Sequence, residues 1–126
     1  MVSKKYGAAH AKLRKHALSF PEAYEEHPWG ESVAKVNKKV FTFMGMPDKE
    51  DGTLGFSVKL VQSHGQALDL DYTEPTGYGL GKSGWVTVRF PLKKSAPPWD
   101  LFFSWIEESY RTIAPKKLVK SLDARS

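Results

Sequence analysis

The sequence predicts an α+β fold, a two-layer sandwich in which helices from both ends of the chain cover one face of an antiparallel β-sheet. Apolar residues recur at helical spacing near both termini, and they alternate with a period of two in the middle of the chain. The connections between the alternating runs are short, as is typical of antiparallel strands. Helices gathered on one face of such a sheet give two layers.

The first helix is expected over residues 4–18, with Ser3 as its cap. The side chains that recur at helical spacing, and so face the core, are Tyr6, Ala9, Leu13 and Ala17. The helix ends before Pro21, because the residue that precedes a proline avoids the helical region. His10 and His16 are expected on the exposed, basic side of this helix.

A β-hairpin is expected over residues 33–44, after a short extended segment at 24–27. In its second strand two sets of residues alternate with a period of two, as in a strand. One set is Val40, Thr42 and Met44, and the other is Phe41 and Phe43. Asn37 and Lys38 form the turn, because asparagine tolerates the left-handed backbone that short hairpins need. A charged loop is expected at 47–52.

Two further strands are expected at residues 54–60 and 85–90, where apolar and polar residues alternate. Ser63 followed by Gln66 has the spacing of a capping box, which predicts a short helix at 64–69. Residues 71–84 read as a long, polar, glycine-rich connection.

The last long helix follows residues 95–98, since proline is tolerated in a first helical turn. Its apolar stripe consists of Trp99, Phe102, Phe103, Ile106, Tyr110 and Ile113. Pro115 ends it, and a basic amphipathic tail follows at 116–122. Because no linker or repeat divides the sequence, a single domain over residues 1–126 is expected.

The composition narrows the functional classes. The chain has no cysteine, which excludes disulfides, thiolate catalysis and cysteine-based zinc sites. No apolar run reaches the length of a membrane span and no secretory signal is recognised, so we expect a cytoplasmic protein without membrane contact. The net charge of +5, from 19 basic and 14 acidic residues, favours partners that carry negative charge.

The glycine-rich segment 77–83 ends in Gly81-Lys82-Ser83, like a phosphate-binding loop. Two facts argue against that function. The first glycine of the motif would fall at position 76, which is Thr76. A phosphate loop also joins a strand to a helix, whereas here a strand follows. A turn that allows close backbone approach is the better interpretation.

Two acidic segments are candidates for reactive sites. The cluster Glu25-Glu26-His27 suits metal binding or proton transfer in principle, but a solvated edge segment is favoured. Glu107 and Glu108 are expected on the exposed side of the last helix. No nucleophile or metal-ligand motif is recognised, so neither a catalytic residue, a metal nor a cofactor is expected.

Basic residues near the strand ends form the candidate binding set. The cations are Lys35, Lys38, Lys39, Lys59, Lys82 and Arg89. They suit contacts with phosphates, which give affinity without sequence specificity. A solvated rim is an interpretation of equal weight. Trp29 and Trp85 lie at turn-to-strand junctions beside lysines, where aromatic rings stack bases or line a pocket.

A series of short motifs resembles the MmcQ/YjbR family of small bacterial proteins. They lie at residues 18–21, 25–30, 35–36, 39–41, 58–60, 84–88 and 107–111. The resemblance extends over roughly residues 12–117, and it implies a CyaY-like α+β fold. It also implies a proposed double-wing mode of DNA binding, in which hairpins act as wings. The turn Asn37-Lys38 departs from the glycine expected in many relatives.

Two functional hypotheses follow. The first is a non-enzymatic DNA-binding protein whose basic hairpin wings hold the phosphate backbone. The second is a module that binds a small ligand or a protein through the aromatic and lysine residues of the sheet face. An enzyme comes last, because no catalytic constellation is recognised.

Overall fold

The computed structural model describes residues 4–45, 52–93 and 95–125. The predicted cap Ser3 and most of the predicted loop 47–52 lie outside these residues. The elements in chain order are α1 (Lys4–Ala17), β1 (Tyr24–Glu26), the 3₁₀ turn η1 (Pro28–Gly30), β2 (Val33–Val36), β3 (Lys39–Phe43), β4 (Thr53–Lys59), α2 (His64–Leu68), β5 (Thr73–Pro75), the 3₁₀ turn η2 (Leu80–Ser83), β6 (Trp85–Pro91), α3 (Trp99–Ile113) and α4 (Lys116–Asp123).

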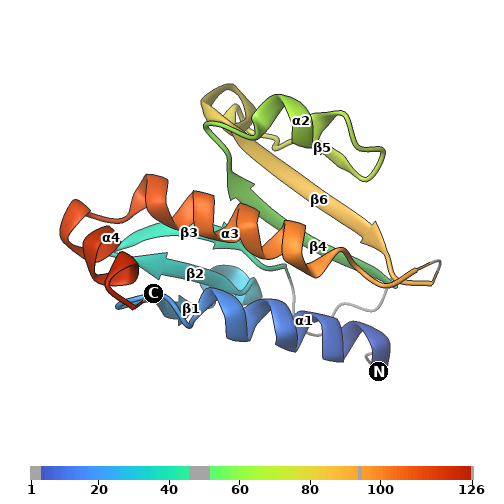
Figure 1. The fold of residues 1–126 in the computed structure, drawn as a ribbon. Helices are drawn as coiled ribbons and strands as arrows, with labels where there is room; N and C mark the ends of the chain where they lie inside the picture. The colour runs from blue at the N-terminus through green and yellow to red at the C-terminus, as the bar shows by residue number, and fades with distance from the viewer. Residues whose placement is uncertain (1–3, 46–51, 94, 126) are drawn as a thin grey trace.

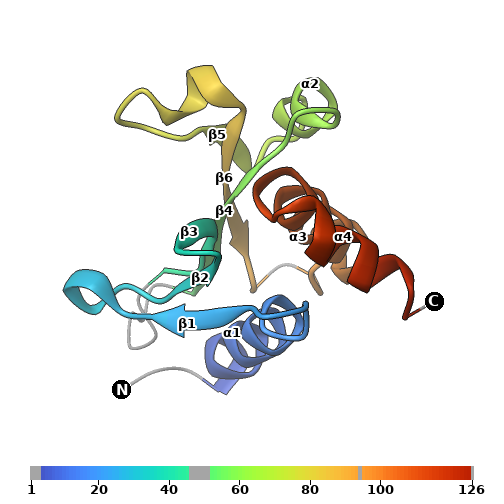
Figure 2. The same cartoon turned by 90° about the vertical axis from the view of Figure 1, so that its left-hand side faces the viewer.

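The six strands form one antiparallel sheet in the order β1-β2-β3-β4-β6-β5 (Figure 1). Helices α1, α2, α3 and α4 lie on one side of it, and among the described residues the other face carries no α-helix (Figure 2). The predicted α+β two-layer fold is therefore confirmed. None of the helices within the described ranges combines the length and apolar character that crossing a bilayer demands.

Strand β5 was not predicted from the sequence. Residues 71–84 were expected to be a connection, but Thr73–Pro75 pairs with β6 at the edge of the sheet, and η2 follows. A three-residue strand that ends in proline has too few residues to display a period of two. An edge position also tolerates proline, because one side of the strand needs no donor.

The β2–β3 hairpin has the predicted two-residue turn. Asn37 and Lys38 both have a positive φ, of 51° and 67°, as a type I′ turn requires. The expected alternation of β3 is interrupted by a bulge. Ala34 pairs with Thr42 but Lys35 pairs with Val40, so Phe41 is an extra residue. Phe41 consequently lies in the core, whereas Phe43 is only half-buried and faces the other way.

The core lies between the sheet and the two long helices. The stripe predicted for α1 is buried, and α3 contributes Phe102, Trp105, Ile106 and Tyr110. The Tyr110 ring packs against Phe20 and Phe41, with centroids 4.8 and 5.2 Å away. Its hydroxyl donates a hydrogen bond of 2.7 Å to the carbonyl of Pro21. This contact ties the end of α1 to α3, so the two helices form one layer.

The expectation that both histidines of α1 lie on the surface was wrong for His10, and His16 is only partly exposed. His10 is buried, and its ring is stacked near Tyr6 with the centroids 5.8 Å apart. His16 lies flat on Phe103, with the centroids 3.9 Å apart. Burial lowers the pKa of both imidazoles. The sequence pattern does not predict these contacts, because whether a histidine ring is covered depends on its aromatic partner. That partner lies one helical turn away for His10 and on another helix for His16.

The short helix α2 is present, but the predicted capping box does not form. Ser63 makes no side-chain cap bond, and its hydroxyl donates instead to Glu108 Oε1 at 2.7 Å. Glu108 Oε2 also accepts the backbone amides of Gln62 and Ser63, at 2.9 and 3.1 Å. The expectation that Glu108 is an exposed helix residue was therefore wrong. Its carboxylate holds the segment that leads into α2.

Candidate functional site

The helix-free face of the sheet presents small and polar side chains. Leu54, Phe56 and Val58 of β4 belong to the core, so the residues between them face the opposite side. In the register of β4 and β6, Ser57 lies opposite Thr87. The same face carries Gly55 opposite Arg89 and Lys59 opposite Trp85. We call this surface the open face.

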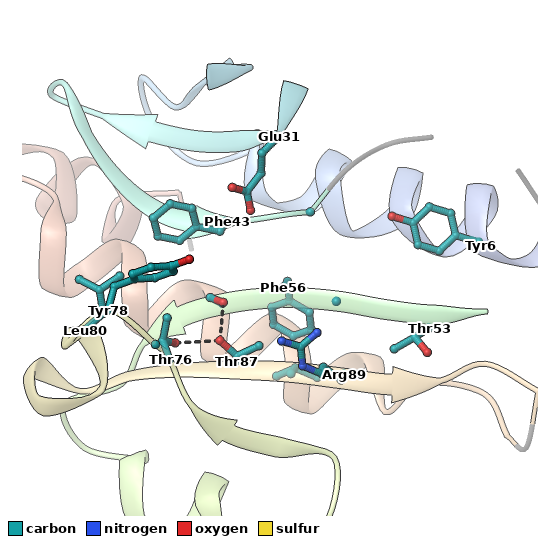
Figure 3. Close-up of a pocket in the computed structure, with 15 residues that line it drawn as sticks. Tyr6, Glu31, Phe43, Thr53, Phe56, Thr76, Tyr78, Leu80, Thr87 and Arg89 are labelled. Atoms are coloured by element: carbon teal, nitrogen blue, oxygen red, sulfur yellow. Dashed lines mark hydrogen bonds between the residues drawn. The ribbon is translucent and has the colours of Figure 1, made fainter. Parts of the chain in front are cut away.

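Two arms project beside the open face (Figure 2). The η1 arm comprises residues 27–31, and the η2 arm comprises residues 76–83. A hollow of about 420 Å³ lies between them over the open face, within the range usual for small-molecule sites. Figure 3 shows Glu31 pointing into it from the η1 arm and Tyr78 from the η2 arm. Phe43 of β3 closes one end.

Three hydroxyl groups form a chain along the floor of the hollow. The oxygens of Ser57 and Thr87 are 2.8 Å apart, and those of Thr76 and Thr87 are 2.9 Å apart. Each hydroxyl carries one donor and two acceptor positions, so three hydroxyls linked by two bonds keep hydrogen-bonding capacity in reserve. The floor is therefore suited to a polar ligand edge (Figure 3).

The positive and negative charges around the hollow offset one another. Arg89 Nε donates to Glu74 Oε1 at 2.6 Å, which offsets the guanidinium charge. Burial raises the pKa of the Glu31 carboxyl, which lies on the other side. When Glu31 is ionised, this part of the open face carries no excess of positive charge. Its chemistry therefore favours an uncharged polar group over a phosphate.

The aromatic side chains have different roles from those expected. Trp85 is only 7% exposed, and its ring packs edge-on against Phe43 with the centroids 5.3 Å apart. It thus supports the wall of the hollow from behind.

Tyr78 is fully exposed and has a positive φ of 59°. It was missed from the sequence, although an aromatic residue between two glycines in a polar loop is a signal for an exposed ring. Trp29 lies in η1, and its side chain is outside the part that the structure describes.

The structure brings together four of the six predicted cations. Lys38 and Lys39 are exposed at the β2–β3 turn, and Lys82 is exposed on η2. The pairing of the strands places this turn, Lys59 at the end of β4 and the start of β6 at one end of the sheet. We call Lys38, Lys39, Lys59 and Lys82 the basic end. It lies beside the hollow, since Lys59 is two residues from Ser57.

The other two predicted cations are held in ion pairs. Lys35 Nζ lies 2.8 Å from Glu26 Oε1 across β1 and β2, and that carboxylate raises the pKa of Lys35. Arg89 is paired with Glu74 across β5 and β6. Exposed pairs are weak, yet each reduces the field that a lone cation presents to an anion. Lys35 and Arg89 therefore contribute less to the positive surface than was expected.

The cluster at residues 25–27 is a structural junction. Glu25 accepts hydrogen bonds from Arg14 Nε at 2.8 Å and from Ser32 Oγ at 2.5 Å. The Arg14 guanidinium, opposed by burial and helped by Ser32, lowers the pKa of Glu25. His27 Nε2 lies 3.4 Å away. The favoured interpretation as a solvated edge was wrong for Glu25, because α1 covers it. Across the residues described, no three His, Asp or Glu side chains are grouped to hold a metal.

The glycine-rich segment has the context expected of a turn and not of a phosphate loop. It connects β5 to the short turn η2, and β6 follows directly. Gly84 has a φ of 96°, and a Cβ at this position would lie 3.0 Å from the carbonyl oxygen of Leu60. Glycine is required there because the η2 arm returns to the sheet by close backbone contact, with the Leu60 amide bonded to the Gly84 carbonyl at 2.9 Å.

Comparison with known families agrees with the motifs and with the fold. Comparison with curated proteins gives no match. The YjbR family model matches residues 18–112, from the end of α1 to the last turn of α3. The match therefore includes the whole sheet, both arms, the basic end and the residues that line the hollow except Tyr6. The chain belongs to the YjbR family.

Proposed function

We propose that this protein binds DNA without catalysis, holding the phosphate backbone at the basic end. Four lysines from three separate segments lie at this end of the sheet, and in the residues described none of them forms an ion pair with an acidic side chain. Unpaired lysines at one end of a sheet attract phosphates through counterion release. The double-wing mode implied by the family resemblance supports the same assignment, with the β2–β3 hairpin as one wing and the η2 arm as the other.

The backbone of Lys38 is the observation that carries the proposal. A lysine at a positive φ is strained by about 1–2 kcal/mol, and a glycine in this type I′ turn would relieve the strain. Residues with a strained backbone cluster at ligand-binding and other functional sites. At Lys38 the side chain is an exposed ammonium group beside Lys39, which suits a contact with phosphate.

A salt titration with charge-matched variants tests the proposal. A fluorescein-labelled 20-base-pair duplex is titrated by anisotropy between 20 and 200 mM NaCl. Removing the tip lysines in Lys38→Gln/Lys39→Gln is expected to lower the slope of log Kobs against log salt by about 1.5–2. The control Lys116→Gln/Lys117→Gln removes the same charge from exposed positions of α4, on the helix side, and is expected to change the slope by less than about 0.5.

Three outcomes would overturn the proposal: no binding at 20 mM NaCl, binding that is insensitive to salt, or an equal loss in both variants. The last outcome would mean that the net charge alone attracts DNA.

A small-ligand module is the second candidate, and the hollow favours it. Because Trp85 packs on Phe43, which lines the hollow, an occupant there is expected to change the indole fluorescence. A metabolite panel that leaves the emission unchanged would count against this candidate.

A further inference from the structure

The hollow and the basic end are adjacent parts of one surface. Lys59 and Ser57 face the same side of β4, two residues apart, which corresponds to about 7 Å along a strand. A phosphate held at Lys59 would therefore place its own nucleotide, or the next one, over the hydroxyl floor. The position of the hollow suggests that it serves the same partner as the lysines.

The hollow is built for the part of a nucleotide that is not charged. Glu31 and the Arg89–Glu74 pair make it a poor site for phosphate. Phe43 and Tyr78 offer aromatic surfaces, and the linked hydroxyls of Ser57, Thr76 and Thr87 offer donors and acceptors at the floor. A nucleobase has these complementary features, an aromatic face and a polar edge.

The shape of the hollow also favours single-stranded over double-stranded nucleic acid. The floor lies between two arms, so a base reaches it only after leaving its own stack. Bases in a duplex are stacked and paired, and extracting one costs a few kcal/mol. A single strand avoids most of this cost. The fully exposed Tyr78 ring at the edge of the hollow supplies a stacking surface for such a base.

We propose that the hollow of the open face receives one unpaired base, so that the protein prefers single-stranded DNA to duplex DNA. This inference rests on the proposed function, because the basic end must hold the neighbouring phosphates.

Affinity for the two forms of one sequence provides the test. Anisotropy is measured on a labelled 12-nucleotide single strand and on its duplex at one salt concentration. The single strand is expected to bind at least about tenfold more tightly. Tyr78→Ala should weaken single-strand binding by about tenfold, the usual loss for one stacked base, and leave duplex binding unchanged. Tyr78→Phe should retain the preference, because it keeps the ring.

One control and two further probes test whether the preference arises in the hollow. Tyr24→Ala removes another exposed tyrosine, on β1 and outside the hollow, and should not change the preference. Thr87→Val removes the central hydroxyl of the chain at nearly constant side-chain volume. It should weaken the binding of the single strand and leave the binding of the duplex unchanged. The fluorescence of a 2-aminopurine base placed in the single strand should change when the wild-type protein binds. It should not change when the Tyr78→Ala variant binds.

The outcomes distinguish the two proposals. Equal affinity for both forms, with Tyr78→Ala without effect, overturns the base site and leaves the DNA-binding proposal intact. Absence of binding to either form at low salt overturns both.

Discussion

The hydroxyl of Ser109 on α3 accepts a hydrogen bond of 2.9 Å from the backbone amide of Lys59 on β4. It also donates to the carbonyl of Phe41 on β3. The ladder between β3 and β4 has only the pairs Thr42–Val58 and Phe43–Ser57, so the serine bridges the two strands where their pairing stops. Helix α3 thereby sets the separation of the two strands that carry the basic end.

Replacing this hydroxyl should destabilise the protein. Ser109→Ala leaves the Lys59 amide and the Phe41 carbonyl without their partner in a buried place, and we expect a loss of about 2 kcal/mol in the free energy of unfolding. Urea denaturation followed by tryptophan fluorescence measures it. Ser104→Ala on the exposed side of α3 is the control, with an expected change within about 0.5 kcal/mol. Equal effects would contradict the bridging role.

Two neighbouring glutamates of α3 should behave differently. Glu108 accepts three hydrogen bonds from Gln62 and Ser63, and we expect Glu108→Ala to cost about 1.5–3 kcal/mol. Glu107 makes an exposed pair with Arg111 at 3.0 Å, so Glu107→Ala should cost less than about 0.5 kcal/mol. Hydrogen exchange of the amides at 62 and 63 should accelerate only in the first variant. Unchanged exchange there would refute the assignment.

The strained turn predicts a trade between stability and binding. Lys38→Gly removes a left-handed lysine, and we expect the free energy of unfolding to rise by about 0.5–1 kcal/mol. The same change should weaken duplex binding, because a charge of the basic end is lost. Asn37→Gly keeps the charge in the same turn and should leave the affinity unchanged. Thermal unfolding and anisotropy measure the two effects, and a Lys38→Gly protein with unaltered affinity would argue against a phosphate contact.

Stability should decrease as the pH falls below about 6.5. Burial lowers the folded-state pKa of His10 and of His16 from 6.5, so the unfolded chain binds more protons than the folded one at mildly acid pH. The stability that the uncharged histidines contribute is fully present above pH 6.5. It is lost as the pH falls from there toward the folded-state pKa values. Glu25, Arg14 and His27 also act on His10, and Glu107 acts on His16, but burial is the largest cause.

Urea midpoints at pH 7.5, 6.5 and 5.5 measure this dependence. His16→Phe keeps the stack on Phe103 and removes the titrating group, so its midpoint should change less with pH than that of the wild type. The slope with pH is the relevant quantity, because the substitution also changes the stability at every pH. A wild-type midpoint that rises on acidification would contradict the lowered pKa values of the two imidazoles.

The amino-acid order alone was sufficient for features that depend on near neighbours. The turn at Asn37 and Lys38, the alternation in β4 and β6 and the apolar stripe of α3 each repeat within a few residues. Such patterns report which side of an element is apolar. That was enough to expect the two-layer α+β fold and the family resemblance, and both are confirmed.

The site depended on contacts between residues far apart in the chain. Strand β5 exists because β6 offers it an edge, and its Glu74 then pairs with Arg89. Glu108 and Ser109 acquire their roles from segments about 45 to 68 residues away. No local period records such partners, because cross-strand register and helix docking follow from the packing of the whole core. The sequence could therefore indicate basic hairpins and an exposed sheet, whereas the folded chain determined which lysines stay unpaired and where the hollow lies beside them.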